Sequence, residues 1–251
     1  MNWLEPVTEV ARLTGQVALR YYRADIAVET KHDGSPVTIA DRAAESVART
    51  WIAEHFPDDA VVGEEGGASG PPNAQRRWVI DPIDGTKSFV RGVPFWGTMI
   101  GVLHGDDVLA GAVFCPALDE IVVAARDQGC WFNGQRCSVS PVATLEQATI
   151  LTTDDRFSDR PRRQQRWNDL AHRVALARTW GDCYGYLMVA TGRAEVMVDN
   201  RLSIWDYAPL VPIVSEAGGV ISGWHGRAAF GGDAIATNAA LAVEVRRLLC
   251  D

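Results

Sequence analysis

The feature that most constrains this chain is the stretch 78–89 (WVIDPIDGTKSF), in which strand-forming residues lead into two aspartates. The apolar residues 78–80 have strand character and end at Asp81. Pro82 is expected to block continuation of the strand, because proline lacks the N–H that a sheet requires. Asp84 then follows on a bend. Two carboxylates and a free carbonyl on one bend suit a hard cation, although an Asx-turn explains the same residues.

Composition limits the classes of partner. With 251 residues and 47% hydrophobic content, the chain can bury the core of one large domain or two modest ones. The net charge of −8 argues against nucleic acid, but a small phosphorylated substrate remains compatible if a divalent metal reverses the local field. No apolar run reaches the length of a membrane span, and Glu5 and Glu9 interrupt any signal-peptide pattern. We expect no membrane partner.

Cysteine and histidine spacing narrows the chemistry further. The five cysteines show no CxxC pair, which favours reduced thiols in a cytoplasmic protein. The five histidines form no HxH or HxxxH pair, so a histidine-ligated zinc site is disfavoured. Any bound metal is therefore expected to have oxygen ligands, which favours magnesium or manganese.

Hydrophobic periodicity predicts an α+β half over residues 1–140 and an α/β half over residues 141–251, which together form one or two structural domains. In the first half we expect helices over 2–23 and 38–56, a polar loop over 68–75 and an antiparallel meander over 97–138. In the second half we expect strands at 148–152, 178–180, 195–198, 220–221 and 234–237, and helices ending near 177 and over 183–192, 205–217 and 239–249.

Further acidic residues occupy similar positions at the ends of elements. Glu64 and Glu65 follow a short strand, Asp41 lies in the first turn of the helix over 38–56, and Asp206 opens the helix over 205–217. Each has a simpler explanation than a site. Glutamates between glycines are usually solvated, and an aspartate in a first helical turn caps the helix.

Three blocks together are more specific than any one of them. The chain resembles the inositol monophosphatase family in the order and spacing of three motifs, and the similarity covers nearly the whole chain. The motifs are GEE at 63–65, DPIDGT at 81–86 and WD at 205–206, and the segment that begins with WD ends in EAGG at 216–219. Members of that family are magnesium-dependent, lithium-sensitive phosphomonoesterases, commonly dimers. The resemblance implies a layered α-β-α-β-α sandwich and a homodimer.

The resemblance also implies a set of metal ligands. Glu64 corresponds to a residue that binds metal and helps to hold the attacking water. The carboxylates of Asp81 and Asp84 and the carbonyl of Ile83 correspond to further ligands, and Asp206 completes the second metal site. Two or three Mg²⁺ ions are expected, with Mn²⁺ as a possible substitute.

The remaining family roles concern water and phosphate. Thr86 corresponds to the residue that orients the water, supported by Asp41. The N–H groups of Gly85 and Thr86, together with Asp84, are expected to meet the substrate at a helix start. Because no nucleophilic side chain is indicated, we expect direct attack by a metal-activated water, without a phosphoenzyme.

Three other segments, 87–94 (KSFVRGVP), 181–185 (GDCYG) and 205–210 (WDYAPL), resemble the histidinol-phosphate phosphatase branch of the family. That branch removes phosphate from L-histidinol phosphate, a step of histidine biosynthesis. The substrate carries an ammonium group, which Asp182 and Asp199 can pair with. A helix cap is the simpler explanation for Asp182.

Alternatives remain open at this point. An inositol-1-phosphatase or a broad sugar-phosphate phosphatase fits the same motifs, and a catalytically silent homologue is disfavoured because the motif acids are all present. Ser88 replaces an asparagine common among relatives. The arginine-rich segment 156–166 fits a phosphate clamp, but a solvated helix start or a subunit contact explains it more simply.

Overall fold

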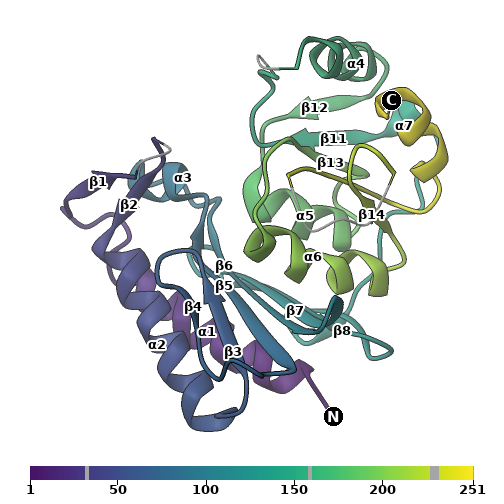
Figure 1. The fold of residues 1–251 in the computed structure, drawn as a ribbon. Coiled ribbons are helices and arrows are strands. Elements are labelled where there is room, and N and C mark those ends of the chain that lie inside the picture. The colour runs from purple at the N-terminus through teal and green to yellow at the C-terminus, as the bar shows by residue number, and fades with distance from the viewer. Residues whose placement is uncertain (32–33, 158–159, 227–231, 251) are drawn as a thin grey trace.

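The chain folds into five alternating layers of helix and sheet (Figure 1). The computed structural model describes residues 1–31, 34–157, 160–226 and 232–250. Helices cover the outer face of each sheet, and another pair of helices separates the two sheets. The α-β-α-β-α sandwich expected from the sequence is therefore confirmed. Within the described ranges, no helix combines the length and the apolar character needed to cross a membrane.

The first layer contains α1 (Leu4–Leu19) and α2 (Ile39–His55), which pack against one face of the larger sheet. The apolar face of α1 approaches this sheet closely at Gly15, where an added Cβ would lie only 2.6 Å from the Phe114 ring. The hairpin of β1 (Val28–Thr30) and β2 (Pro36–Thr38) joins the two helices. The helices predicted over 2–23 and 38–56 are thus confirmed.

The larger sheet has the strand order β10-β9-β8-β7-β6-β5-β3-β4. Its strands are β3 (Ala60–Gly63), β4 (Gly67–Ser69), β5 (Arg76–Asp84), β6 (Gly97–His104), β7 (Asp107–Cys115), β8 (Glu120–Ala125), β9 (Gly129–Phe132) and β10 (Gln135–Arg136). The predicted meander is confirmed, and its Asn133-Gly134 turn has the two positive φ angles, 46° and 79°, of a tight hairpin. The loop predicted over 68–75 is partly wrong, because β4 pairs with β3 there.

The prediction that Pro82 ends the strand is wrong. Strand β5 continues through Pro82 to Asp84, and its pairing with β6 shifts register between Asp81, opposite Met99, and Asp84, opposite Gly97. A β-bulge of this kind tolerates proline because the bulged residue makes no ladder hydrogen bond.

The middle layer consists of α5 (Asp182–Ala190) and α6 (Ile204–Glu216), which lie between the two sheets (Figure 1). Helix α6 approaches β7 so closely that a Cβ on Gly111 would lie 2.0 Å from the Pro209 carbonyl oxygen. Glycine is therefore required at Gly111. This close packing fixes the first turn of α6 over the centre of the larger sheet.

The smaller sheet has the order β12-β11-β13-β15-β14 and is covered by two outer helices. Its elements are β11 (Thr149–Thr152), β12 (Leu176–Arg178), β13 (Val196–Asp199), β14 (Val220–Ser222), β15 (Ala234–Thr237), α4 (Pro161–Ala171) and α7 (Ala242–Leu249), preceded by a 3-10 turn at Leu145–Gln147. The alternation predicted here is confirmed, but the helix predicted to end near 177 ends at Ala171, and β12 begins two residues before the predicted strand. Residues 161–166 of the arginine-rich segment belong to α4, and its residues 158–159 lie outside the described residues.

One arginine of that segment has a structural role. Arg163 is buried and contacts Asp233 at 2.7 Å and Asn200 at 3.0 Å. Arg156, in contrast, is exposed and pairs with its neighbour Asp154 at 3.1 Å.

Candidate active site

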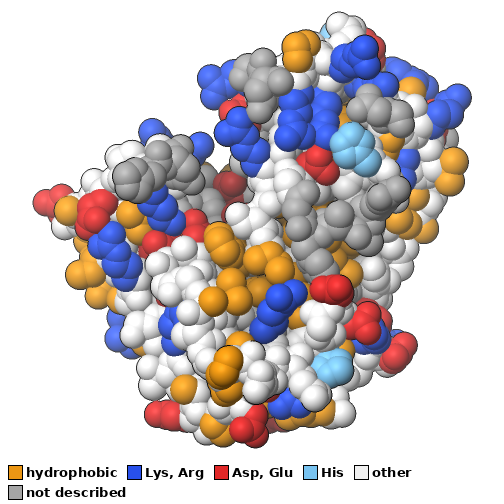
Figure 2. All heavy atoms as spheres, viewed as in Figure 1, with side chains coloured by type: hydrophobic (Ala, Val, Ile, Leu, Met, Phe, Trp, Pro, Cys, Tyr) orange, Lys and Arg blue, Asp and Glu red, His pale blue; other side chains and the backbone are white. Residues whose placement is uncertain are grey.

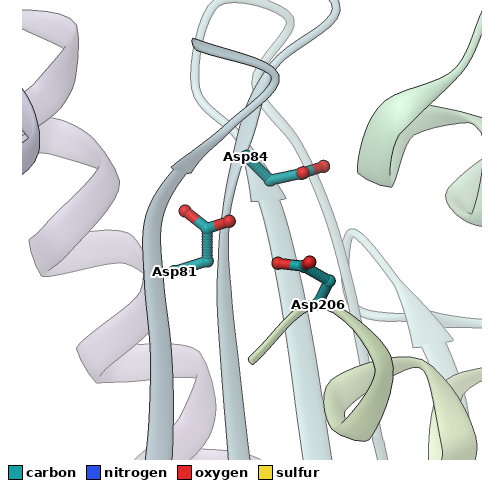
Figure 3. Close-up of side chains that lie close together, drawn as sticks. All are labelled: Asp81, Asp84 and Asp206. Atoms are coloured by element: carbon teal, nitrogen blue, oxygen red, sulfur yellow. The ribbon is translucent and has the colours of Figure 1, made fainter. Parts of the chain in front are cut away.

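Three aspartates from distant parts of the chain converge between the sheets. Asp81 and Asp84 come from β5, and Asp206 comes from the first turn of α6 (Figure 3). One carboxylate oxygen of each lies within 4.8 Å of those of the other two. We refer to these residues as the acidic cluster.

The bulge in β5 explains how two aspartates three positions apart share one face. In a regular strand, residues separated by an odd number point to opposite faces. The register shift between Asp81 and Asp84 resets this alternation. Ile83 consequently packs with Ala18 and Ala40 on the α1/α2 side, which leaves both carboxylates on the α6 side.

Each carboxylate of the acidic cluster is held by a backbone N–H. Asp81 Oδ1 accepts from Ile83 at 2.9 Å, and Asp206 Oδ2 accepts from Ser203 at 2.7 Å. Asp84 Oδ2 accepts from Cys183 at the start of α5. The capping interpretation of Asp206 is therefore correct, and it is compatible with a site because each carboxylate retains free lone pairs.

Burial and mutual repulsion raise the pKa values of the acidic cluster. The pKa of Asp84 rises to about 8, first because the group is buried and then because of the Asp206 charge. Burial raises the pKa of Asp206 to about 7, with Glu64 adding to the effect. The pKa of Asp81 is also raised, by burial and by the Glu64, Asp84 and Asp206 charges. Three ionised carboxylates this close require a cation between them.

Glu64 lies beside the acidic cluster because the parallel pairing of β3 with β5 continues as far as Glu64. Its N–H donates to the Ile80 carbonyl at 3.1 Å. Its carboxylate accepts from Lys31 Nζ at 2.7 Å, and the same ammonium lies 2.6 Å from Glu65. Burial opposes the charge of Lys31, but the hydrogen bonds to both glutamates prevail and raise its pKa. Lys31 could not be recognised from the sequence, since a lysine in a hairpin loop has no characteristic spacing.

The loop that carries Glu64 is held in place by a buried glutamate of α2. Glu45 of α2 accepts from the N–H groups of Glu65 and Gly66, both at 2.8 Å. A Cβ on Gly63 would lie 2.4 Å from the Glu45 carboxylate. A side chain at Gly63 would therefore displace the Glu45 carboxylate from its hydrogen bonds to this loop.

The side chains of Thr86 and Asp41 form their hydrogen bonds with different residues, Ile83 and Thr38 respectively. Thr86 Oγ1 donates to the Ile83 carbonyl at 3.0 Å. Asp41 accepts from the Thr38 N–H at 2.8 Å and from its hydroxyl at 2.7 Å, which closes the predicted helix cap. Burial raises the pKa of Asp41. The roles of Thr86 and Asp41 in catalysis and of the Ile83 carbonyl as a metal ligand remain predictions.

Gly85 connects β5 to the short helix α3 (Thr86–Val90). Its φ of 82° favours glycine, and an added Cβ would lie 3.0 Å from Asp182 Oδ2. Gly85 thus brings the acidic cluster and Asp182 into close proximity.

A cavity of about 360 Å³ opens beside the acidic cluster. It is lined by five carboxylates and three cations: Asp84, Asp154, Asp182, Asp199, Asp206, Lys87, Arg156 and Arg201. Figure 2 shows basic side chains gathered near a hollow between the two halves of the molecule, on the side where Figure 1 places α4. The cavity therefore has an acidic wall and cationic groups.

The two candidate substrate carboxylates both line this cavity. Asp182 has a φ of 51°, an uncommon conformation for a residue with a side chain. Burial, followed by the Asp84 charge, raises its pKa to about 8. Asp199, at the end of β13, has a pKa raised to about 7 by burial. The Lys87 charge and a hydrogen bond from Ser88 partly oppose this rise in pKa at Asp182.

The donor set of the acidic cluster fits a hard divalent cation. Asp81, Asp84 and Asp206 offer oxygen atoms alone, and Glu64 extends the same set. Carboxylate oxygens are the ligands that Mg²⁺ and Mn²⁺ prefer. Repulsion among the buried charges gives a physical reason for a cation to bind at this place.

Comparisons with known proteins agree with the motifs and with the fold. The profile of the inositol monophosphatase family matches residues 2–250. A histidinol-phosphatase from Chlorobaculum parvum is 41% identical over 225 residues, which is 89% of this chain and 86% of that protein. One from Mycobacterium tuberculosis is 39% identical, covering 90% and 89%. The extragenic suppressor protein suhB from Bartonella henselae superposes with a TM-score of 0.93 at 27% identity, covering 99% and 98%.

Proposed function

Because the chain belongs to the inositol monophosphatase family of phosphatases, we propose that it hydrolyses L-histidinol phosphate to L-histidinol and phosphate with Mg²⁺ as cofactor. The observation that carries this proposal is a single cavity lined by Asp84 and Asp206 of the acidic cluster and also by Asp182 and Asp199. The first pair suits a cation-bound phosphate, and the second suits the ammonium group of the alcohol.

At the phosphate end, the chain supplies ligands and positioning. Asp81, Asp84 and Asp206 would hold the divalent cation, which would neutralise phosphoryl oxygens and lower the pKa of the attacking water. The Glu64 carboxylate, which also pairs with Lys31, would accept a hydrogen bond from that water and orient it. The N–H groups at Gly85 and Thr86 bind the phosphate.

At the alcohol end, charge decides which ester fits. The ammonium of histidinol phosphate can donate charge-assisted hydrogen bonds to Asp182 and Asp199, whereas inositol offers only hydroxyl groups. Burial makes an uncompensated carboxylate costly at both positions. A cationic alcohol is therefore favoured over a neutral one. The names of the relatives from Chlorobaculum parvum and Mycobacterium tuberculosis support this choice.

The second candidate is an inositol-1-phosphate or sugar-phosphate phosphatase. It is supported by the description of the family as a whole. We also propose a homodimer and a cytoplasmic location, on the family resemblance and on the absence of CxxC pairs among the five cysteines.

Replacing Asp182 with asparagine tests the role of the alcohol end. Asp182→Asn keeps the size of the side chain but removes its charge, so KM for L-histidinol phosphate is expected to rise about tenfold. KM for myo-inositol 1-phosphate should change much less. Steady-state phosphate release with saturating Mg²⁺ measures both constants for the wild type and the variant.

The same assay can contradict the proposal in two ways. A wild-type enzyme with a higher kcat/KM for myo-inositol 1-phosphate supports the second candidate. Equal loss on both esters in Asp182→Asn means that this residue has a structural role. Asp127→Asn is a suitable control, because that exposed aspartate lies in a turn of the larger sheet.

A further inference from the structure

We propose that Tyr186 and Thr153 are positioning residues that hold Asp199 and Asp182 as one receptor for a cationic alcohol. We call this arrangement the carboxylate brace. The inference rests on the proposed function and deepens it, because it assigns substrate preference to two residues outside the acidic cluster.

Tyr186 holds Asp199 from the core side. Its hydroxyl donates to Asp199 Oδ2 at 3.0 Å, and both residues are buried. Tyr186 lies on α5, between the two sheets (Figure 1), and its ring packs in the core shared by α5 and α6. Because burial strongly raises the pKa of this phenol, the hydroxyl remains a donor at physiological pH. One oxygen of Asp199 is thus fixed.

Thr153 connects both carboxylate residues to the end of β11. Its N–H donates to Asp199 Oδ1 at 3.3 Å, and its hydroxyl accepts from the Asp182 N–H at 2.8 Å. The pairing of Thr152 with Val198 in the parallel strands β11 and β13 places Thr153 next to Asp199. A Cβ on Gly181 would lie 2.2 Å from Thr153 Cα, so this contact is tight.

The hydroxyl of Thr153 also stabilises an uncommon backbone conformation. Asp182 adopts a φ of 51°, which places its side chain near Gly85, where an added Cβ would lie 3.0 Å from Asp182 Oδ2. A residue with a side chain persists in this conformation only when its surroundings hold it there. The hydrogen bond from the Asp182 N–H to Thr153 supplies such a constraint.

The brace has a consequence for the choice of substrate. Both oxygens of Asp199 accept a hydrogen bond from the protein, which leaves the remaining lone pairs free to receive an N–H donor. The donors from Tyr186 and Thr153 also oppose the effect of burial on the pKa of Asp199. A fixed, charged carboxylate favours an ammonium group over a hydroxyl group.

The test compares two esters in two variants. L-histidinol phosphate carries the ammonium group, and glycerol 2-phosphate is a neutral-alcohol ester. We define the selectivity ratio as KM for glycerol 2-phosphate divided by KM for L-histidinol phosphate. Tyr186→Phe is expected to lower this ratio about tenfold, through KM for histidinol phosphate rather than through kcat, because a hydrogen bond to a charged group is lost.

Matched variants separate positioning from general destabilisation. Tyr22→Phe removes a tyrosine hydroxyl that donates to the Gly92 carbonyl at 2.6 Å outside the cavity, and it should retain the wild-type ratio. Thr153→Val should lower the ratio, and Thr153→Ser, which keeps the hydroxyl, should restore it. Thermal melting identifies any variant that does not fold, and the threonine pair then tests the brace in place of Tyr186→Phe.

The outcomes distinguish the brace from the proposed function. A wild-type enzyme without preference for histidinol phosphate contradicts both. A wild-type enzyme with that preference, combined with folded Tyr186→Phe and Thr153→Val variants that retain its ratio, overturns the brace alone. Equal increases in KM for both esters also overturn it, since they indicate general damage to the cavity.

Discussion

Replacing Asp84 with asparagine is expected to lower kcat about 10³-fold on every phosphate ester, or about 4 kcal/mol of transition-state stabilisation. The asparagine oxygen can still accept the hydrogen bond from the Cys183 N–H. What the variant loses is the negative charge that the cation requires within the acidic cluster. Phosphate release from L-histidinol phosphate and from glycerol 2-phosphate measures the effect.

The control is a carboxylate on the surface. Asp107→Asn removes one partner of an exposed ion pair with Arg126 and should leave kcat within about twofold, because exposed pairs contribute little. Thermal melting without metal should show Asp84→Asn to be at least as stable as the wild type, since a repelling charge is gone. Retention of more than a tenth of wild-type kcat would rule out Asp84 as an essential ligand.

The second large effect is stabilisation by Mg²⁺, which is expected to raise Tm by about 5–10 °C at pH 8 when the ion is at about 100 times its Kd. The pKa of Asp84 is raised from 3.8 to about 8, and that of Asp206 from 3.8 to about 7. Without metal, the folded protein therefore binds more protons than the unfolded chain between about pH 4 and 8. The contribution of these groups to stability is present below about pH 4 and is lost as the pH rises through 7 to 8.

The expected pH dependence of the Mg²⁺ effect follows from the direction of these pKa shifts. Mg²⁺ replaces the protons, so its stabilising effect should be small at pH 5.5 and should grow towards pH 8. Melting curves with Mg²⁺ and with chelator, at both pH values, measure the difference. Asp84→Asn should lose most of the increase, whereas Asp107→Asn should keep it. A shift that is equal at both pH values would argue against the acidic cluster as the binding site.

The sequence predicted those features of the fold and site that depend on local pattern. The strand into Asp81 and the helix starts next to Asp41 and Asp206 are confirmed. The layered architecture, which the family resemblance implied, is confirmed as well. Local pattern also caused the error at Pro82. Proline disfavours a strand in isolation, but the pairing of β5 with β6 accommodates it in a bulge.

The remaining features depend on contacts between distant residues. Lys31 approaches Glu64 across 33 positions, and Thr153 approaches Asp199 across 46. Tyr186 is one of several apolar or aromatic residues on a nearly fully buried helix. Periodicity in the sequence therefore does not distinguish its hydrogen-bonding hydroxyl from the other buried side chains. The positive φ of Asp182 likewise depends on Thr153. Such contacts follow from tertiary packing, and one sequence alone does not encode them in a recognisable motif.

We propose that Asp81, Asp84 and Asp206 hold the cation on which hydrolysis depends, and anomalous diffraction from crystals grown with Mn²⁺ locates that cation. The acidic cluster, whose carboxylate oxygens lie within 4.8 Å of one another, predicts an anomalous peak between these three side chains. It also predicts that the peak is lost in crystals of Asp84→Asn. Mn²⁺-dependent phosphate release by protein whose crystals show the Mn²⁺ peak elsewhere, with none at the acidic cluster, would contradict the account.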